Sequence, residues 1–135
     1  MDELDKGIWI DETQAWIVYK KYKQINLKSV GSVVEPYHLR GGSRSSTPWG
    51  PQETVSETGL LRRKKQQLRT YFRRVIQELL PAKRVYIMGP AEAKIGLQKE
   101  LEQMKSLSFK SMVVETADSM TQNQFKAKVK EFFAE

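Results

Sequence analysis

The sequence contains no cysteine and only one histidine, His38, in 135 residues. Without cysteine the chain can form neither disulfides nor thiolate metal sites, and a cysteine nucleophile is excluded. A site built on two histidines is excluded as well, and a catalytic triad would have to use His38. Because a domain without disulfides needs no oxidising compartment, we expect a cytoplasmic protein.

Long apolar runs are also missing. No stretch approaches the ~20 apolar residues that a transmembrane helix needs, and the acidic start, Met1 to Asp5, lacks the apolar core of a signal peptide. We therefore expect neither a membrane span nor a secretory signal. Apolar residues make up 39% of the chain and charged residues 29%. This balance predicts one globular domain, residues 1–135, large enough to bury a core without disulfides.

Acidic residues are scarce in one segment. Between Pro36 and Arg84 there are eleven Lys and Arg residues and three Glu residues, a net charge of +8. The rest of the chain holds twelve basic and thirteen acidic residues, or −1, and the total is +7. A one-sign surface on a balanced domain is typical of proteins that bind a polyanion such as RNA or DNA. A membrane surface, an acidic protein, or a merely solvated basic face remain as alternatives.

Three apolar runs open the chain, at Gly7–Ile10, Gln14–Tyr22 and Ile25–Val34. Their very short connections predict an antiparallel meander of three strands. Gly31, inside the third run, predicts a bulge or bend. Asp11-Glu12-Thr13 is a turn sequence between the first two runs.

The next segment, 35–57, has no periodicity and carries three of the eight glycines and three of the five prolines. It predicts a long flexible loop, which in a compact domain is commonly functional or disordered. Helical periodicity then extends from Thr58 to Leu80, with Pro81 as the stop signal. Its predicted apolar face consists of Leu61, Leu68, Phe72, Val75, Ile76 and Leu79. At 100° per residue, one outer flank carries Arg62, Arg69 and Arg73, and the outer face lacks acids that would pair it within the helix.

The remaining chain alternates strands and helices. Strands are predicted at Arg84–Met88 and within Phe109–Glu115, and helices at Ala91–Met104 and Thr121–Phe133. The order is βββ-αβαβα, and crossovers of this length usually give parallel strands and right-handed connections. We therefore predict an α/β fold with a mixed five-stranded sheet, in the ribonuclease H-like class of topologies.

Three constellations were considered for chemistry. Asp11 follows the first strand, where ribonuclease H-like nucleases place a metal ligand, but no motif supplies the further acids that a two-metal site needs. His38 lies near Ser43, Ser45 and Ser46 without a motif for a nucleophilic serine. The turn Gly89–Lys94 resembles a phosphate-binding turn before a helix but lacks the glycines and the Lys-Ser/Thr ending of known fingerprints. We expect no cofactor and no metal.

The most informative segment is a glycine- and arginine-rich run that ends just before the basic helix. Gly41 and Gly42 allow close approach of the backbone to a ligand, because no Cβ intervenes. Flanking arginines can hold phosphates bidentately, and an aromatic ring can stack on a base. The predicted RNA-binding residues are His38, Arg40, Gly41, Gly42, Ser43, Arg44, Trp49, Arg62, Arg69 and Arg73.

The run His38-Leu39-Arg40-Gly41-Gly42-Ser43, followed by the helix Leu60–Leu80, resembles the middle domain of the class-1 release factors of eukaryotes and archaea. In that family a basic Gly-Gly-Gln loop precedes a long arginine-rich helix. The similarity continues through Val85–Lys94, where the family has an apolar strand, a turn and a lysine. Ile8–Asp11 and the Gly89-Pro90-Ala91 turn also resemble small bacterial relatives of the domain.

The resemblance implies a domain of the translational machinery that acts at the ribosome, with ribosomal RNA or tRNA as its partner. Ser43 stands at the position of the family's catalytic glutamine, which puts hydrolysis in doubt. In this respect the chain is similar to loop variants of the family such as Pelota. We therefore predict an RNA-binding protein without hydrolytic activity. The alternative is a peptidyl-tRNA ester hydrolase that uses the Gly-Gly loop.

Overall fold

A computed structural model describes residues 1–32, 50–104 and 106–134, and for residues 50–57 it describes the backbone alone. The elements follow in the order β1 (Asp5–Ile10), β2 (Gln14–Lys21), β3 (Gln24–Gly31), α2 (Gly50–Leu79), β4 (Arg84–Gly89), α3 (Ala93–Gln103), β5 (Ser111–Thr116) and α4 (Gln122–Phe132). This is the predicted βββ-αβαβα order, and the predicted fold class is confirmed.

The five strands form one mixed sheet in the order β3-β2-β1-β4-β5. β2 runs antiparallel to β1 and β3, whereas β4 runs parallel to β1 and β5, which is the ribonuclease H-like arrangement. Tyr22 and Lys23 close the β2–β3 hairpin with φ of 52° and 66°, as a two-residue turn that matches the strand twist requires. The predicted bulge at Gly31 is wrong, because pairing runs without a break from Lys21–Gln24 to Gln14–Gly31.

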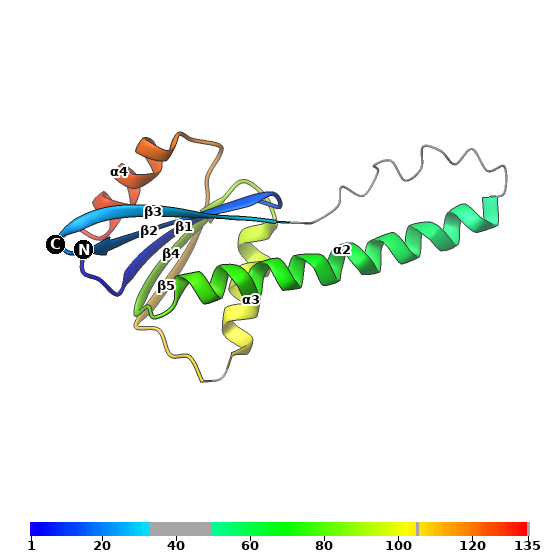
Figure 1. Cartoon of the computed structure of the whole chain (residues 1–135), viewed down its shortest axis with the longest axis horizontal. Helices are drawn as coiled ribbons and strands as arrows, with labels where there is room; N and C mark the ends of the chain where they lie inside the picture. The colour runs from blue at the N-terminus through cyan, green and yellow to red at the C-terminus, as the bar shows by residue number, and fades with distance from the viewer. Residues whose placement is uncertain (33–49, 105, 135) are drawn as a thin grey trace.

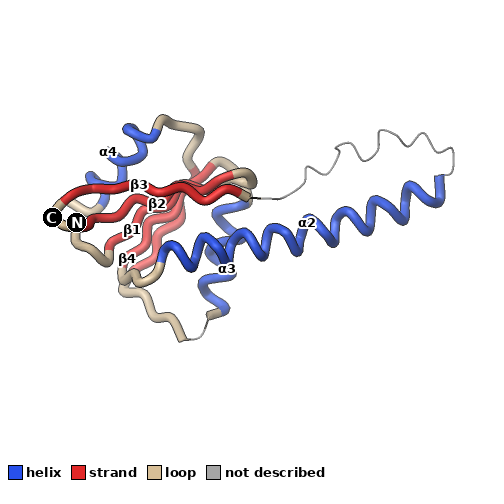
Figure 2. The backbone as a smooth tube through the Cα atoms, in the orientation of Figure 1, coloured by secondary structure: helices blue, strands red, loops and turns tan. Residues whose placement is uncertain are grey.

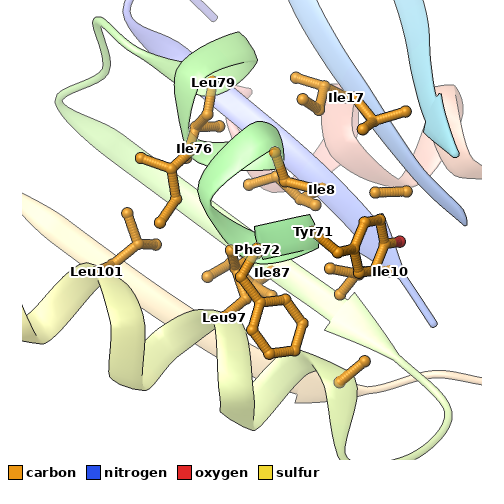
Figure 3. Packing of buried hydrophobic residues seen from close by; sticks show 14 of the residues in the cluster. Ile8, Ile10, Ile17, Tyr71, Phe72, Ile76, Leu79, Ile87, Leu97 and Leu101 are labelled. Atoms are coloured by element: carbon orange, nitrogen blue, oxygen red, sulfur yellow. The ribbon is translucent and has the colours of Figure 1, made fainter. Parts of the chain in front are cut away.

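Helices cover both faces of the sheet (Figures 1 and 2). α2 and α3 lie on one face because the crossovers β3–α2–β4 and β4–α3–β5 run the same way across the sheet with the same hand. Figure 3 shows their contact with the sheet, where residues of α2 and α3 pack over sheet residues in one cluster: Tyr71, Phe72, Ile76 and Leu97 over Ile8, Ile10 and Ile87. α4 packs on the opposite face through Phe125 and Val129.

The long helix begins earlier than its periodicity indicates. α2 starts at Gly50 instead of Thr58, so the predicted loop 35–57 is wrong for residues 50–57, while residues 33–49 lie outside the described part. Pro51 falls in the first turn, where proline is tolerated because its missing N–H would have no partner in the helix. The helix ends at Leu79, close to the predicted stop before Pro81.

Only the C-terminal part of α2 packs on the sheet. Thirty residues make a helix of about 45 Å, and Figure 1 shows its N-terminal part extending well beyond the edge of the sheet. Leu61, expected on the apolar face, is 53% exposed because it lies in this projecting part. Phe72, Val75, Ile76 and Leu79 are buried as predicted. Among the described helices, none has the length and hydropathy needed to cross a bilayer.

Candidate nucleic-acid interface

α2 carries a group of basic side chains on its outward flank, close to α3. Arg62, Arg69 and Arg73 follow the seven- and four-residue spacing that places them on one side of the helix. All three are exposed, and the side chains of Arg69 and Arg73 retain 57% and 61% of their accessible surface. The packed face of α2 fixes this orientation, because Phe72, Val75 and Ile76 point into the core.

An acid from the neighbouring helix meets these arginines. Oε1 of Glu100, on α3, lies 3.9 Å from Nε of Arg69 and 3.6 Å from Nε of Arg73. The prediction concerned acids within the helix itself, and this acid comes from another element. The sequence gives no sign of the contact, because Glu100 is remote from the arginines along the chain and is brought there by the packing of α3 against α2. Both contacts use Nε, so the terminal guanidinium nitrogens are not the atoms that Glu100 holds.

The other flank of α2 contacts the β1–β2 turn and strand β3. Lys64 forms an ion pair of 3.1 Å with Glu12, in the β1–β2 turn. Arg74 donates through Nη1 to the carbonyl oxygen of Gly31, at 3.1 Å. Near the end of the helix, Glu78 pairs with Lys28 of β3 at 3.1 Å. These contacts serve to seat the helix, so this flank has fewer cations free for a ligand than its sequence indicates.

Arg84, counted in the basic segment, is also structural. Its Nε and Nη2 donate to the two carboxylate oxygens of Asp5 at 2.7 and 2.5 Å. Asp5 is buried, with 1% of its surface exposed. Burial raises the pKa of Asp5, but the hydrogen bonds and positive charge of Arg84 outweigh it, so the pKa lies below the usual 3.8. The positively charged surface therefore does not include every basic residue of the segment from Pro36 to Arg84.

Seven of the predicted RNA-binding residues lie outside the described part of the chain: His38, Arg40, Gly41, Gly42, Ser43, Arg44 and Trp49. Trp49 directly precedes the first residue of α2 in sequence. Of the ten predicted residues, Arg62, Arg69 and Arg73 are therefore the ones that the structure places, all on the same flank of α2.

A cavity of about 380 Å³ brings together two of the candidates for chemistry. It is lined by Asp11 and its turn on one side and by Ala91, Glu92 and Ala93 on the other. Oδ1 of Asp11 accepts hydrogen bonds from the backbone N–H groups of Thr13 and Gln14 at 2.8 and 2.9 Å. Asp11 thus acts in turn formation, as its sequence context indicates. Across the described residues, no group of three or more acidic or histidine side chains could hold a metal ion.

The turn after β4 has a structural role. Gly89 passes so close to β1 that an added Cβ would lie 2.1 Å from the carbonyl oxygen of Ile10. Lys94 is buried and its Nζ donates to the carbonyl oxygen of Ala91 within the same turn. The acids Glu12 and Glu92 line the cavity in front of the helix start and would repel a phosphate. The turn is best explained as a tight connection between strand and helix.

Three residues at the α2–α3 contact escaped the sequence prediction as site residues: Lys65, Lys99 and Glu100. Lys65 belongs to the basic helix and shares the flank of Arg69, so spacing alone could have found it. Lys99 and Glu100 carry no signal of their own in the sequence. Their place in the site becomes apparent only in the structure, where α2 and α3 pack side by side.

Solved structures of larger proteins share this fold. The archaeal translation termination factor aRF1 aligns with a TM-score of 0.58 and 18% identity, over 94% of this chain and 33% of that one. Pelota from Archaeoglobus fulgidus aligns with a TM-score of 0.56 and 14% identity, over 96% of this chain and 31% of that one. Pelota from Thermoplasma acidophilum gives 0.50 and 14%, over 94% and 31%.

The chain therefore spans about a third of the length of each of these proteins. No family model and no curated protein sequence matches it. At these identities the likeness is one of fold. The predicted resemblance to a release-factor and Pelota domain is confirmed at that level: almost the whole chain folds as one part of those proteins does.

Proposed function

We propose that this chain is a ribosome- or tRNA-associated RNA-binding domain that acts in translation in the cytoplasm and has no hydrolytic activity. The observation that carries the proposal is the exposed arginine flank of α2, formed by Arg62, Arg69 and Arg73, on a fold shared with aRF1 and Pelota. Guanidinium groups in this setting bind phosphates, and the phosphate backbone supplies most of the sequence-independent affinity for nucleic acid.

The shape of α2 limits where its phosphate contacts can lie. α2 is anchored at its C-terminal end by Phe72, Ile76 and Leu79 and extends beyond the sheet at its N-terminal end (Figure 1). The projecting residues 50–61 contain Glu53 and Glu57 but no lysine or arginine, so the phosphate contacts are assigned to Arg62 and to the arginines of the anchored part of the helix. In the proposed mode, the arginine flank contacts phosphates, and Arg40, Gly41 and Gly42, which precede the helix in sequence, contribute further contacts to the RNA.

The proposed absence of hydrolysis rests on Ser43, because a serine replaces the glutamine that helps to place water in the release factors that this chain resembles. The competing function, a peptidyl-tRNA ester hydrolase, needs the Gly-Gly loop to orient water without that glutamine. Release of a labelled peptide from peptidyl-tRNA on ribosomes distinguishes the two. We expect no release above the rate without protein, and catalytic release would establish the hydrolase instead.

The binding claim is tested by cosedimentation with ribosomes and with total tRNA. We expect binding near 50 mM salt and loss of most of it at several hundred millimolar, since about four phosphate contacts would release about four counterions. Absence of binding at low salt would contradict the proposal. Binding that is insensitive to salt would also contradict it, since it would point to an apolar protein interface.

A further inference from the structure

A groove of about 200 Å³ lies between α2 and α3. Its floor is apolar, formed by Leu68 and Phe72 of α2. Gly96 of α3 makes this close packing possible, because a Cβ there would lie 2.5 Å from Cε2 of Phe72. The groove is smaller than the roughly 300–1,000 Å³ of enclosed ligand pockets. It is therefore better suited to one unit of a chain that crosses the surface than to a free small molecule.

The walls of the groove are mainly cationic. Lys65 and Arg69 come from α2, and Lys99 comes from α3. Glu100 is the one acid among the lining residues, and its side chain is largely buried, with 12% exposed. The lining therefore carries three positive charges against one negative charge. Arg73, which is not among the lining residues, adds a further cation beside Glu100.

We propose that this groove binds one nucleotide unit of a single-stranded RNA segment, an inference that rests on the proposed function. Its phosphate lies between Lys65, Lys99 and the terminal nitrogens of Arg69, and its ribose or base rests on the floor of Leu68 and Phe72. The proposal extends the interface from α2 to α3 and assigns a role to Lys99. Glu100 is a positioning residue. Its carboxylate lies beside Nε of Arg69 and Arg73 and leaves their terminal guanidinium nitrogens available for phosphate.

The composition of the groove favours a nucleotide over an acidic peptide. A carboxylate would satisfy the cations as well as a phosphate does, but an acidic peptide offers little apolar surface for the floor. A nucleotide brings a charged group and a flat apolar face on one unit, which is the combination that single-strand binding sites use.

The experiment compares Lys99→Gln with Lys130→Gln by fluorescence anisotropy of labelled polyuridylate over a range of salt. Lys130 is an exposed lysine of α4, on the opposite face of the sheet, so the two variants lose the same charge. We expect Lys99→Gln to reduce the magnitude of the slope of log K against log salt by about 0.7. If the two proteins bind equally at 1 M salt, the variant should then bind about fivefold more weakly than the wild type at 0.1 M salt. Lys130→Gln should bind as the wild type does.

The outcomes separate the groove from the proposed function. If Lys99→Gln matches Lys130→Gln while an Arg69→Ala/Arg73→Ala protein binds weakly, the groove proposal fails and the function stands. If the wild type binds neither polyuridylate nor ribosomes, both fail. Competition by polyglutamate or inorganic polyphosphate as strong as by polyuridylate, at equal charge, would also overturn the nucleotide assignment. Weaker competition by both would support it.

Discussion

The buried side chain of Asp5 forms an ion pair with the partly exposed Arg84 where β1 and β4 lie side by side. The folded state holds Asp5 with a pKa below 3.8, so the unfolded chain binds its proton more readily. The pair therefore stabilises the fold fully above about pH 4–5, and this stabilisation is lost as the pH falls through the lowered pKa. Although Arg84 belongs to the basic segment, it therefore stabilises the fold and is not part of the proposed RNA-binding surface.

Asp5→Asn should lower the free energy of unfolding by about 3 kcal/mol at pH 7, since removing one partner leaves the other charge poorly compensated. The variant should also lose less stability than the wild type between pH 5 and pH 3, because the titrating group is gone. Urea unfolding at both pH values measures this, with Asp118→Asn, an exposed acid, as the control. Parallel pH dependences for wild type and Asp5→Asn would count against the pair as the source.

Two glycines provide a second test at the residue scale. An alanine Cβ at Gly89 would lie 2.1 Å from the Ile10 carbonyl oxygen, whereas one at Gly31 would meet nothing within 4 Å. Gly89→Ala should therefore cost about 3 kcal/mol or more through forced backbone movement. Gly31→Ala should stay within about 0.5 kcal/mol. Equal thermal unfolding of the two variants would show that the approach of β4 to β1 is looser than described.

At the scale of the element, α2 combines an anchored part with a projecting part. Leu79 is fully buried and Leu61 is 53% exposed, although both lie on the stripe that sequence periodicity marks as apolar. Leu79→Ala should therefore lower the free energy of unfolding by about 2–5 kcal/mol. Leu61→Ala should change it by less than about 0.5 kcal/mol. Urea denaturation compares the two, and a large cost at Leu61 would mean that the N-terminal part of α2 packs against another surface.

The elements differ in how far the sequence could predict them. The three N-terminal strands, β4, β5 and the ends of α4 follow from apolar runs and caps, and Thr121 forms the capping box that begins α4. The start of α2 was missed because residues 50–57 lack apolar periodicity, and because a glycine and a proline, Gly50 and Pro51, are typical of loops. Pro51 was the available signal, since proline is favoured in the first turn of a helix.

At the scale of the whole molecule, charge along the sequence predicted the basic helix but not its partners. Arg84 meets Asp5, Lys64 meets Glu12, and Arg69 meets Glu100 across long sequence distances. Such pairs follow from the packing of elements and cannot be derived from a count of charges. The topology itself was predictable, because short connections and right-handed crossovers leave few arrangements of this element order.

The central claim is that the arginine flank of α2 binds RNA phosphates, and a salt titration tests it most directly. Arg69→Ala/Arg73→Ala is compared with Lys126→Ala/Lys130→Ala, two lysines with the same four-residue spacing on α4, on the opposite face of the sheet. Binding of total tRNA or ribosomes should show a slope of log K against log salt of roughly −3 for the wild type and the α4 variant. The arginine variant should lose about one to two units of slope and bind more weakly whatever the RNA sequence. Identical slopes and affinities for the two double variants would contradict the account.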